Sequence, residues 1–126
     1  MVTAEFSVKV ADLGEARGLA IDSTMTSVGT PHFAAPEVLR SERYDASADV
    51  YSFGIFLYEL AARQLPYAGE SPALVLRGVV SGELRPAMPA DAPAAVAQLA
   101  AACWAHDAAQ RPSFAGALEV LTSVEL

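Results

Sequence analysis

Asp12-Leu13-Gly14 opens a polar stretch of the chain that closes on Ala35-Pro36-Glu37. Between these two triplets the sequence is rich in Gly, Ser and Thr and shows no sustained helical period. It is therefore predicted to be a long loop, and long loops inside compact domains are usually functional or disordered. Immediately before it, residues 4–11 alternate apolar and polar side chains, which predicts a short, half-buried strand.

After the loop, the sequence predicts helices almost to its end. Residues 47–63 form the strongest one; it is apolar nearly all round, as a buried helix is, and Ser47 is its predicted N-cap. The others are predicted at 36–40, where Pro36 suits a first turn, at 72–80 after the N-cap Ser71, at 93–104, and from Phe114 to Ser123 after the N-cap Ser113. The expected fold class is mainly α, with a short β segment at the N-terminus.

Composition narrows the class of protein. The chain has 126 residues, of which 53% are hydrophobic, enough for one domain with a sizeable core. A net charge of −7 argues against nucleic acid or an anionic membrane surface as a partner. Cys103 is the single cysteine, so no internal disulfide forms, which fits a reducing, cytoplasmic compartment. No apolar stretch reaches the roughly 18 residues of a membrane-spanning helix.

Four motifs, in order and at family spacing, resemble the catalytic domain of a protein kinase. They are Val8–Gly14 (a strand and metal-binding motif), Gly29–Glu37 (a substrate-docking loop), Asp49–Gly54 (the start of a buried central helix), and Cys103-Trp104 with Gln110–Phe114 (the closing motif of the tyrosine-kinase-like group). The resemblance covers nearly the whole chain. It implies that residues 1–126 are a partial kinase domain, comprising a strand within 1–11, an activation segment at 12–37 and helices of the C-terminal lobe at 38–123.

The resemblance gives roles to two residues of the activation segment. Asp12 resembles the carboxylate that holds Mg²⁺ against the phosphates of ATP, although Asp-Leu-Gly by itself also suits an ordinary loop aspartate at a strand end. Thr30 resembles the substrate-docking threonine of Ser/Thr kinases; the alternative is a solvated loop threonine. Tyrosine kinases usually carry a Trp shortly before Ala-Pro-Glu, where this chain has His32-Phe33-Ala34. Ser/Thr specificity is therefore expected.

Further residues have implied regulatory or structural roles. Phosphorylation inside the activation segment would order the loop against arginines, although Ser and Thr are also ordinary loop residues; the candidates are Ser23, Thr24, Thr26 and Ser27. The resemblance implies a buried ion pair between Glu37 and Arg111, and a role for Asp49 in supporting the backbone of the catalytic loop. Cys103 is expected in the core, not as a nucleophile.

Several kinase parts do not occur in this sequence: the Gly-rich loop, the strand lysine, and the catalytic loop with its base and Asn. The resemblance places the base upstream of Met1, so the chain is interpreted as truncated just after the catalytic loop. We expect it to be inactive alone and to bind ATP and Mg²⁺ poorly. Its expected partners are a protein substrate or the missing N-terminal lobe. The alternative is a non-catalytic binding or scaffold module that acts through residues 71–110.

Overall fold

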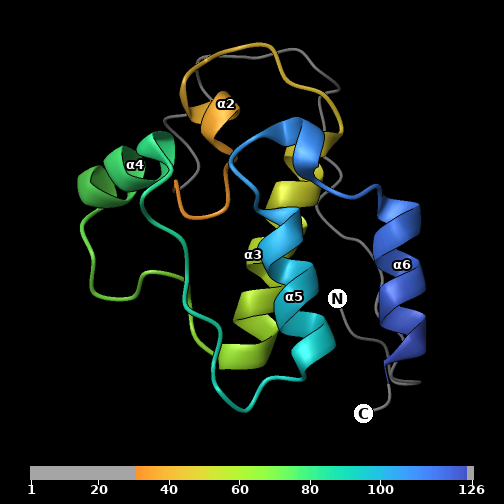
Figure 1. Cartoon of the computed structure of the whole chain (residues 1–126). Coiled ribbons are helices and arrows are strands. Elements are labelled where there is room, and N and C mark those ends of the chain that lie inside the picture. The colour runs from red at the N-terminus through yellow and green to blue at the C-terminus, as the bar shows by residue number, and fades with distance from the viewer. Residues whose placement is uncertain (1–30, 125–126) are drawn as a thin grey trace, which may run out of the picture.

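The structure, a computed structural model, describes residues 31–124, and over this range it is helical. In chain order the elements are α2 (Pro36–Leu39), α3 (Ser47–Ala62), α4 (Pro72–Ser81), α5 (Ala94–Cys103), the 3₁₀ turn η2 (Ala108–Gln110) and α6 (Phe114–Ser123). Figure 1 shows α3 and α5 side by side at the centre, with α6 on one flank and α4 on the other. The mainly α fold class is thus confirmed, and the predicted strand at 4–11 lies outside the described residues.

The start of α3 differs from the prediction. Ser47 is the first helical residue, and the N-cap is Ala46, whose φ of −60° and ψ of −20° are already helical. The side chain that caps this end belongs to Asp45, whose carboxylate accepts hydrogen bonds from the backbone nitrogen of Ser47 at 2.9 Å and from its hydroxyl at 2.5 Å. The prediction of Ser47 as the N-cap is therefore wrong, because Asp45 supplies the acceptor two residues earlier.

Helices α3 and α5 approach each other closely at Gly54. A methyl group built on Gly54 would lie 2.7 Å from Cβ of Cys103 and 3.0 Å from the carbonyl oxygen of Ala100. Only a glycine leaves room for this contact, and it lets the two helices share the buried core. The side chains fully buried there include Tyr51, Ile55 and Cys103.

The outer face of α3 is more exposed than its sequence predicts. Phe56 and Leu60 are 40% and 59% exposed, so the expectation of a helix buried all round is wrong. Helix α6 behaves similarly: Ala117 is buried, whereas Phe114 and Leu118 are 46% and 61% exposed. Phe53 joins the two helices, because its ring lies 6.3 Å from that of Phe56 and 5.9 Å from that of Phe114. We call the surface formed by five of these apolar residues the α3–α6 face: Phe53, Phe56 and Leu60 of α3, and Phe114 and Leu118 of α6.

Helices α4 and α6 begin as the sequence predicts. The hydroxyl of Ser71 accepts a hydrogen bond from the backbone nitrogen of Leu74 at 3.2 Å, and Pro72 follows at the first helical position. The hydroxyl of Ser113 accepts from the nitrogen of Gly116 at 3.0 Å. Both capping predictions are confirmed, because each serine is followed by a helix whose first free amide needs an acceptor.

Candidate functional site

Residues 31–37 lead into α2 and include its first two residues. We call them the docking segment after the substrate-docking loop that the sequence resemblance predicts at Gly29–Glu37. Its last three residues, Ala35, Pro36 and Glu37, are buried. Farther back, the hydroxyl of Ser52 on α3 donates a hydrogen bond to the carbonyl oxygen of Phe33 at 2.7 Å. The ring of His32 lies 5.9 Å from that of Tyr67, which follows α3. The segment is thus held from α3 and from the chain just beyond it.

The structure brings Glu37 and Arg111 together. Nη1 of Arg111 donates to Oε2 of Glu37 at 2.6 Å, and Nη2 donates to Oε1 at 3.0 Å. The arginine side chain is 0% exposed and the glutamate side chain 10%. Burial tends to raise the pKa of Glu37, but the hydrogen bonds and charge of Arg111 outweigh it, so the pKa lies below its usual value. The pair is therefore ionised and bidentate, the strongest geometry for an arginine and a carboxylate.

Arg111 also holds backbone from two other parts of the chain. Its Nε donates to the carbonyl oxygen of Ala105 at 2.9 Å, and its Nη1 donates to that of Ser47 at 3.1 Å. Its guanidinium carbon lies 5.1 Å from the centre of the Tyr51 ring. One side chain thereby joins the start of α3, the residues after α5 and the end of the docking segment.

Comparison with known proteins identifies this arrangement. A family model described as "Protein tyrosine and serine/threonine kinase" matches residues 1–121. The chain belongs to this kinase family. Members of the family use ATP and Mg²⁺ to phosphorylate proteins.

Curated relatives within the kinase family are similar over almost the whole chain. A probable serine/threonine-protein kinase of Dictyostelium discoideum, drkB, is 44% identical over 99% of this chain and 18% of its own length. The serine/threonine-protein kinase STY46 of Arabidopsis thaliana is 42% identical over 93% of this chain and 20% of its own length. The dual specificity protein kinase pyk3 of Dictyostelium discoideum is 35% identical over 94% of this chain and 9% of its own length. The chain thus spans a fifth or less of these relatives.

Many of the kinase residues predicted from the sequence lie outside the described range. They are the metal ligand Asp12, the docking threonine Thr30 and the four candidate phosphorylation sites Ser23, Thr24, Thr26 and Ser27. Asp49 lies in the first turn of α3 and is exposed. Within residues 31–124, no cluster of His, Cys, Asp or Glu has the arrangement to hold a metal ion, and no helix is long and apolar enough to cross a membrane.

A hollow of about 570 Å³ adjoins the Glu37–Arg111 pair, between the turn before α3 and the turn before η2. Its lining carries both signs of charge, with Arg40 and Arg43 as cations and Asp45 and Asp107 among the acids. Both aspartates already accept hydrogen bonds from local backbone nitrogens. This mixture favours no single ionic ligand.

Three residues with many buried contacts were missed by the sequence reasoning. Arg85 is half-buried after α4, and the hydroxyls of Tyr51 and Tyr67 are buried without a hydrogen-bond partner among the described residues. Tyr51 did carry a signal, because it stands where kinases usually have Trp. Arg85 lies in a loop with no periodic pattern, so nothing in the sequence separated it from an ordinary surface arginine.

Proposed function

We propose that this chain is the helical portion of a Ser/Thr protein kinase domain, whose complete form transfers the γ-phosphate of ATP to serine or threonine of a protein. The observation that carries the proposal is the bidentate Glu37–Arg111 pair, which fastens the end of the docking segment to the C-terminal helices. The names of drkB and STY46 as serine/threonine-protein kinases support the specificity. His32-Phe33-Ala34, in place of a Trp before Ala-Pro-Glu, supports it as well.

The residue roles follow the kinase family. Asp12 would hold Mg²⁺, which neutralises charge on the phosphates during transfer. Thr30 would hydrogen-bond the catalytic base, Asp49 would support the catalytic-loop backbone, and the Ser23–Ser27 stretch would take a regulatory phosphate. The Gly-rich loop, strand lysine and catalytic base are missing from this sequence, so the chain alone is proposed to be inactive and to hold ATP and Mg²⁺ weakly.

The exposed apolar side chains of the α3–α6 face support the same proposal. Its exposed aromatic and leucine side chains lie on two neighbouring helices and are joined through the ring of Phe53. Apolar patches of this kind mark surfaces that bind another protein segment. We propose that the remaining part of a kinase domain covers the face. A cytoplasmic location is proposed with it, which the single, fully buried cysteine supports.

A chimera tests the function directly. The part of this chain that matches drkB, over 125 residues, would replace the corresponding part of drkB. Radioactive phosphate transfer to a mixed protein substrate would be measured, followed by phosphoamino-acid analysis. We expect phosphoserine and phosphothreonine. The variant Asp12→Ala should lower the rate at least about 100-fold, because Mg²⁺ supplies much of the electrostatic stabilisation. The matched control Asp22→Ala, in the same segment, should leave most of the activity.

Two results would contradict the proposal. The first is phosphotyrosine as the main product, which would remove the Ser/Thr specificity. The second is a folded chimera without activity, or with activity that Asp12→Ala leaves unchanged. An inactive but folded chimera that still binds kinase substrates would favour the non-catalytic binding or scaffold module instead.

A further inference from the structure

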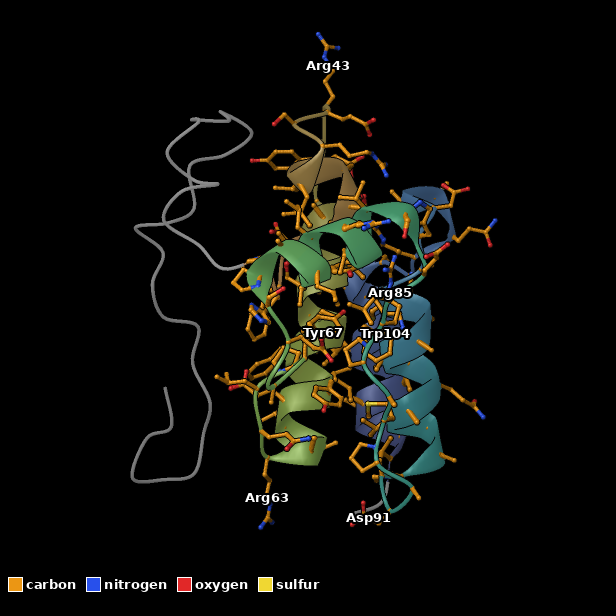
Figure 2. The ribbon with its side chains drawn as sticks, turned by 90° about the vertical axis from the view of Figure 1, so that its left-hand side faces the viewer. Arg43, Arg63, Tyr67, Arg85, Asp91 and Trp104 are labelled. Atoms are coloured by element: carbon orange, nitrogen blue, oxygen red, sulfur yellow. The ribbon has the colours of Figure 1, made fainter. Side chains whose placement is uncertain are left out.

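Arg85 follows α4 and is bonded to backbone on two sides. Its Nε donates to the carbonyl oxygen of Trp104, at the end of α5, at 3.0 Å. Its Nη1 donates to the carbonyl oxygens of Leu84 at 2.7 Å and Val79 at 3.4 Å. Figure 2 shows Arg85 beside Trp104 among the helices, whereas Arg43 and Arg63 extend away from them. Among the described residues no carboxylate forms an ion pair with Arg85.

The guanidinium of Arg85 also lies over an aromatic ring. Its central carbon is 5.2 Å from the centre of the Tyr51 ring, and that of Arg111 is 5.1 Å from the same centre. Tyr51 and the Arg111 side chain are both 0% exposed, so the contact between them is shielded from water, which strengthens it, whereas Arg85 is half-buried. A buried ring in close packing has little freedom to move. The position of one guanidinium is therefore linked to that of the other.

Arg111 is the residue that binds Glu37 at the end of the docking segment. A continuous series of contacts thus runs from Arg85 to Tyr51, on to Arg111, and finally to Glu37. We propose that Arg85 is a positioning residue for the docking segment, acting through the Tyr51 ring on the Arg111–Glu37 pair. That this segment docks a substrate rests on the proposed function, whereas the coupling of Arg85 to the Arg111–Glu37 pair does not.

The competing explanation is that Arg85 only ties its own loop to the end of α5. The two explanations differ in what happens at α2, which contains Glu37 and has backbone hydrogen bonds of its own. There, the nitrogens of Val38 and Leu39 donate to the carbonyl oxygen of Ala35, each at 3.0 Å, and that of Arg40 donates to Pro36 at 2.9 Å. The exchange of these three amide hydrogens with deuterium reports how firmly the docking segment is held.

The experiment measures amide exchange by NMR on the full 126-residue chain and on its Arg85→Met variant, which keeps the length of the side chain. We expect the three α2 amides to exchange roughly tenfold faster in the variant, while amides inside α3 change much less. The Nε–H signal of Arg111 should also shift, because its guanidinium lies over the same ring. The matched control is Arg77→Met, an exposed arginine on α4, which should alter neither signal.

Two further variants keep the outcome decisive. Tyr51→Leu removes the ring and should reproduce the faster α2 exchange, and adding Arg85→Met to it should cause no further local increase. Arg85→Lys keeps the charge and serves if Arg85→Met does not fold; it should speed α2 exchange by a smaller factor. A uniform increase over all helices, or faster exchange confined to residues 82–93 with an unshifted Arg111 signal, would overturn the proposal. None of these measurements requires kinase activity, so failure of the proposed function leaves them interpretable.

Discussion

The Glu37–Arg111 pair offers the sharpest test of what holds this fold together. In Arg111→Met the carboxylate of Glu37 stays buried without its cation, and the carbonyl oxygens of Ala105 and Ser47 lose their donor. Breaking one side of a buried ion pair costs about 3–5 kcal/mol. Glu37→Gln keeps one acceptor oxygen but replaces the other, which also accepts from Arg111, with an amide nitrogen that only donates. It removes the charge and one of the two hydrogen bonds, so it should cost about 1.5–3 kcal/mol. The free energy of unfolding would be measured by urea denaturation followed by circular dichroism.

A double-mutant cycle separates the pair from the rest of the Arg111 contacts. Combining Glu37→Gln with Arg111→Met should give a coupling energy of about 2–3 kcal/mol. The surface pair of Arg40 and Glu42, at 3.1 Å with side chains 32% and 54% exposed, is the matched control. Its cycle should give less than about 1 kcal/mol. Equal coupling in the two cycles would refute the reasoning, because burial would then add nothing.

The same pair gives the stability a defined dependence on pH. The hydrogen bonds and charge of Arg111 hold the pKa of Glu37 lower in the folded chain than in the unfolded chain. Its stabilising contribution is therefore fully present above the unfolded value and is lost as the pH falls through the folded value. Between neutral pH and the acid region, Arg111→Met should show a smaller loss of stability than the wild-type chain. A parallel acid profile in the variant would contradict the assigned cause.

Other substitutions test the packing and the buried polar groups. Gly54→Ala should lower the free energy of unfolding, measured by urea denaturation, by about 1–3 kcal/mol, because its methyl group meets Cβ of Cys103 at 2.7 Å. The control Gly116→Ala, whose methyl group has its nearest neighbour at 3.4 Å, should be neutral or slightly stabilising in the same measurement. Tyr51→Phe should raise the free energy of unfolding by about 1 kcal/mol and with it the melting temperature, since the Tyr51 hydroxyl is buried without a partner among the described residues. A lower melting temperature would contradict this and would reveal a hydrogen bond to the hydroxyl. Burial raises the pKa of Cys103 to about 11, so iodoacetamide at pH 8 should label it only after denaturation, and rapid labelling of folded chain, read by mass spectrometry, would contradict its burial.

The helices could be predicted because their signals are local. Ser71 and Ser113 each precede a helix and accept from its first turn, as their positions indicate. Ser47 misled the prediction because Asp45, also a good capping residue, lies two positions earlier. The choice between these two capping residues depends on the backbone angles of Ala46 between them, which a sequence pattern does not report.

Burial and long-range contacts were harder to predict. The helical pattern of α3 shows that Phe56 and Leu60 are apolar, but not which neighbour covers them, and in the structure they are exposed. Glu37 and Arg111 could be paired beforehand only through the resemblance to kinases, because no local rule connects residues so far apart. The cluster of Arg85, Tyr51 and Arg111 depends on three elements meeting in space, so it became visible only in the structure.

The distance along the chain between Glu37 and Arg111 also bears on how quickly the molecule forms and comes apart. The two residues are 74 positions apart, and closing a loop of that length costs about 4 kcal/mol of chain entropy. Local helices form without closing a long loop, so we expect the pair to form late, after the rate-limiting barrier. Substitutions at the pair should then leave the refolding rate nearly unchanged and accelerate unfolding. We therefore expect the ion pair to affect how long the folded helices stay together more than how fast they fold.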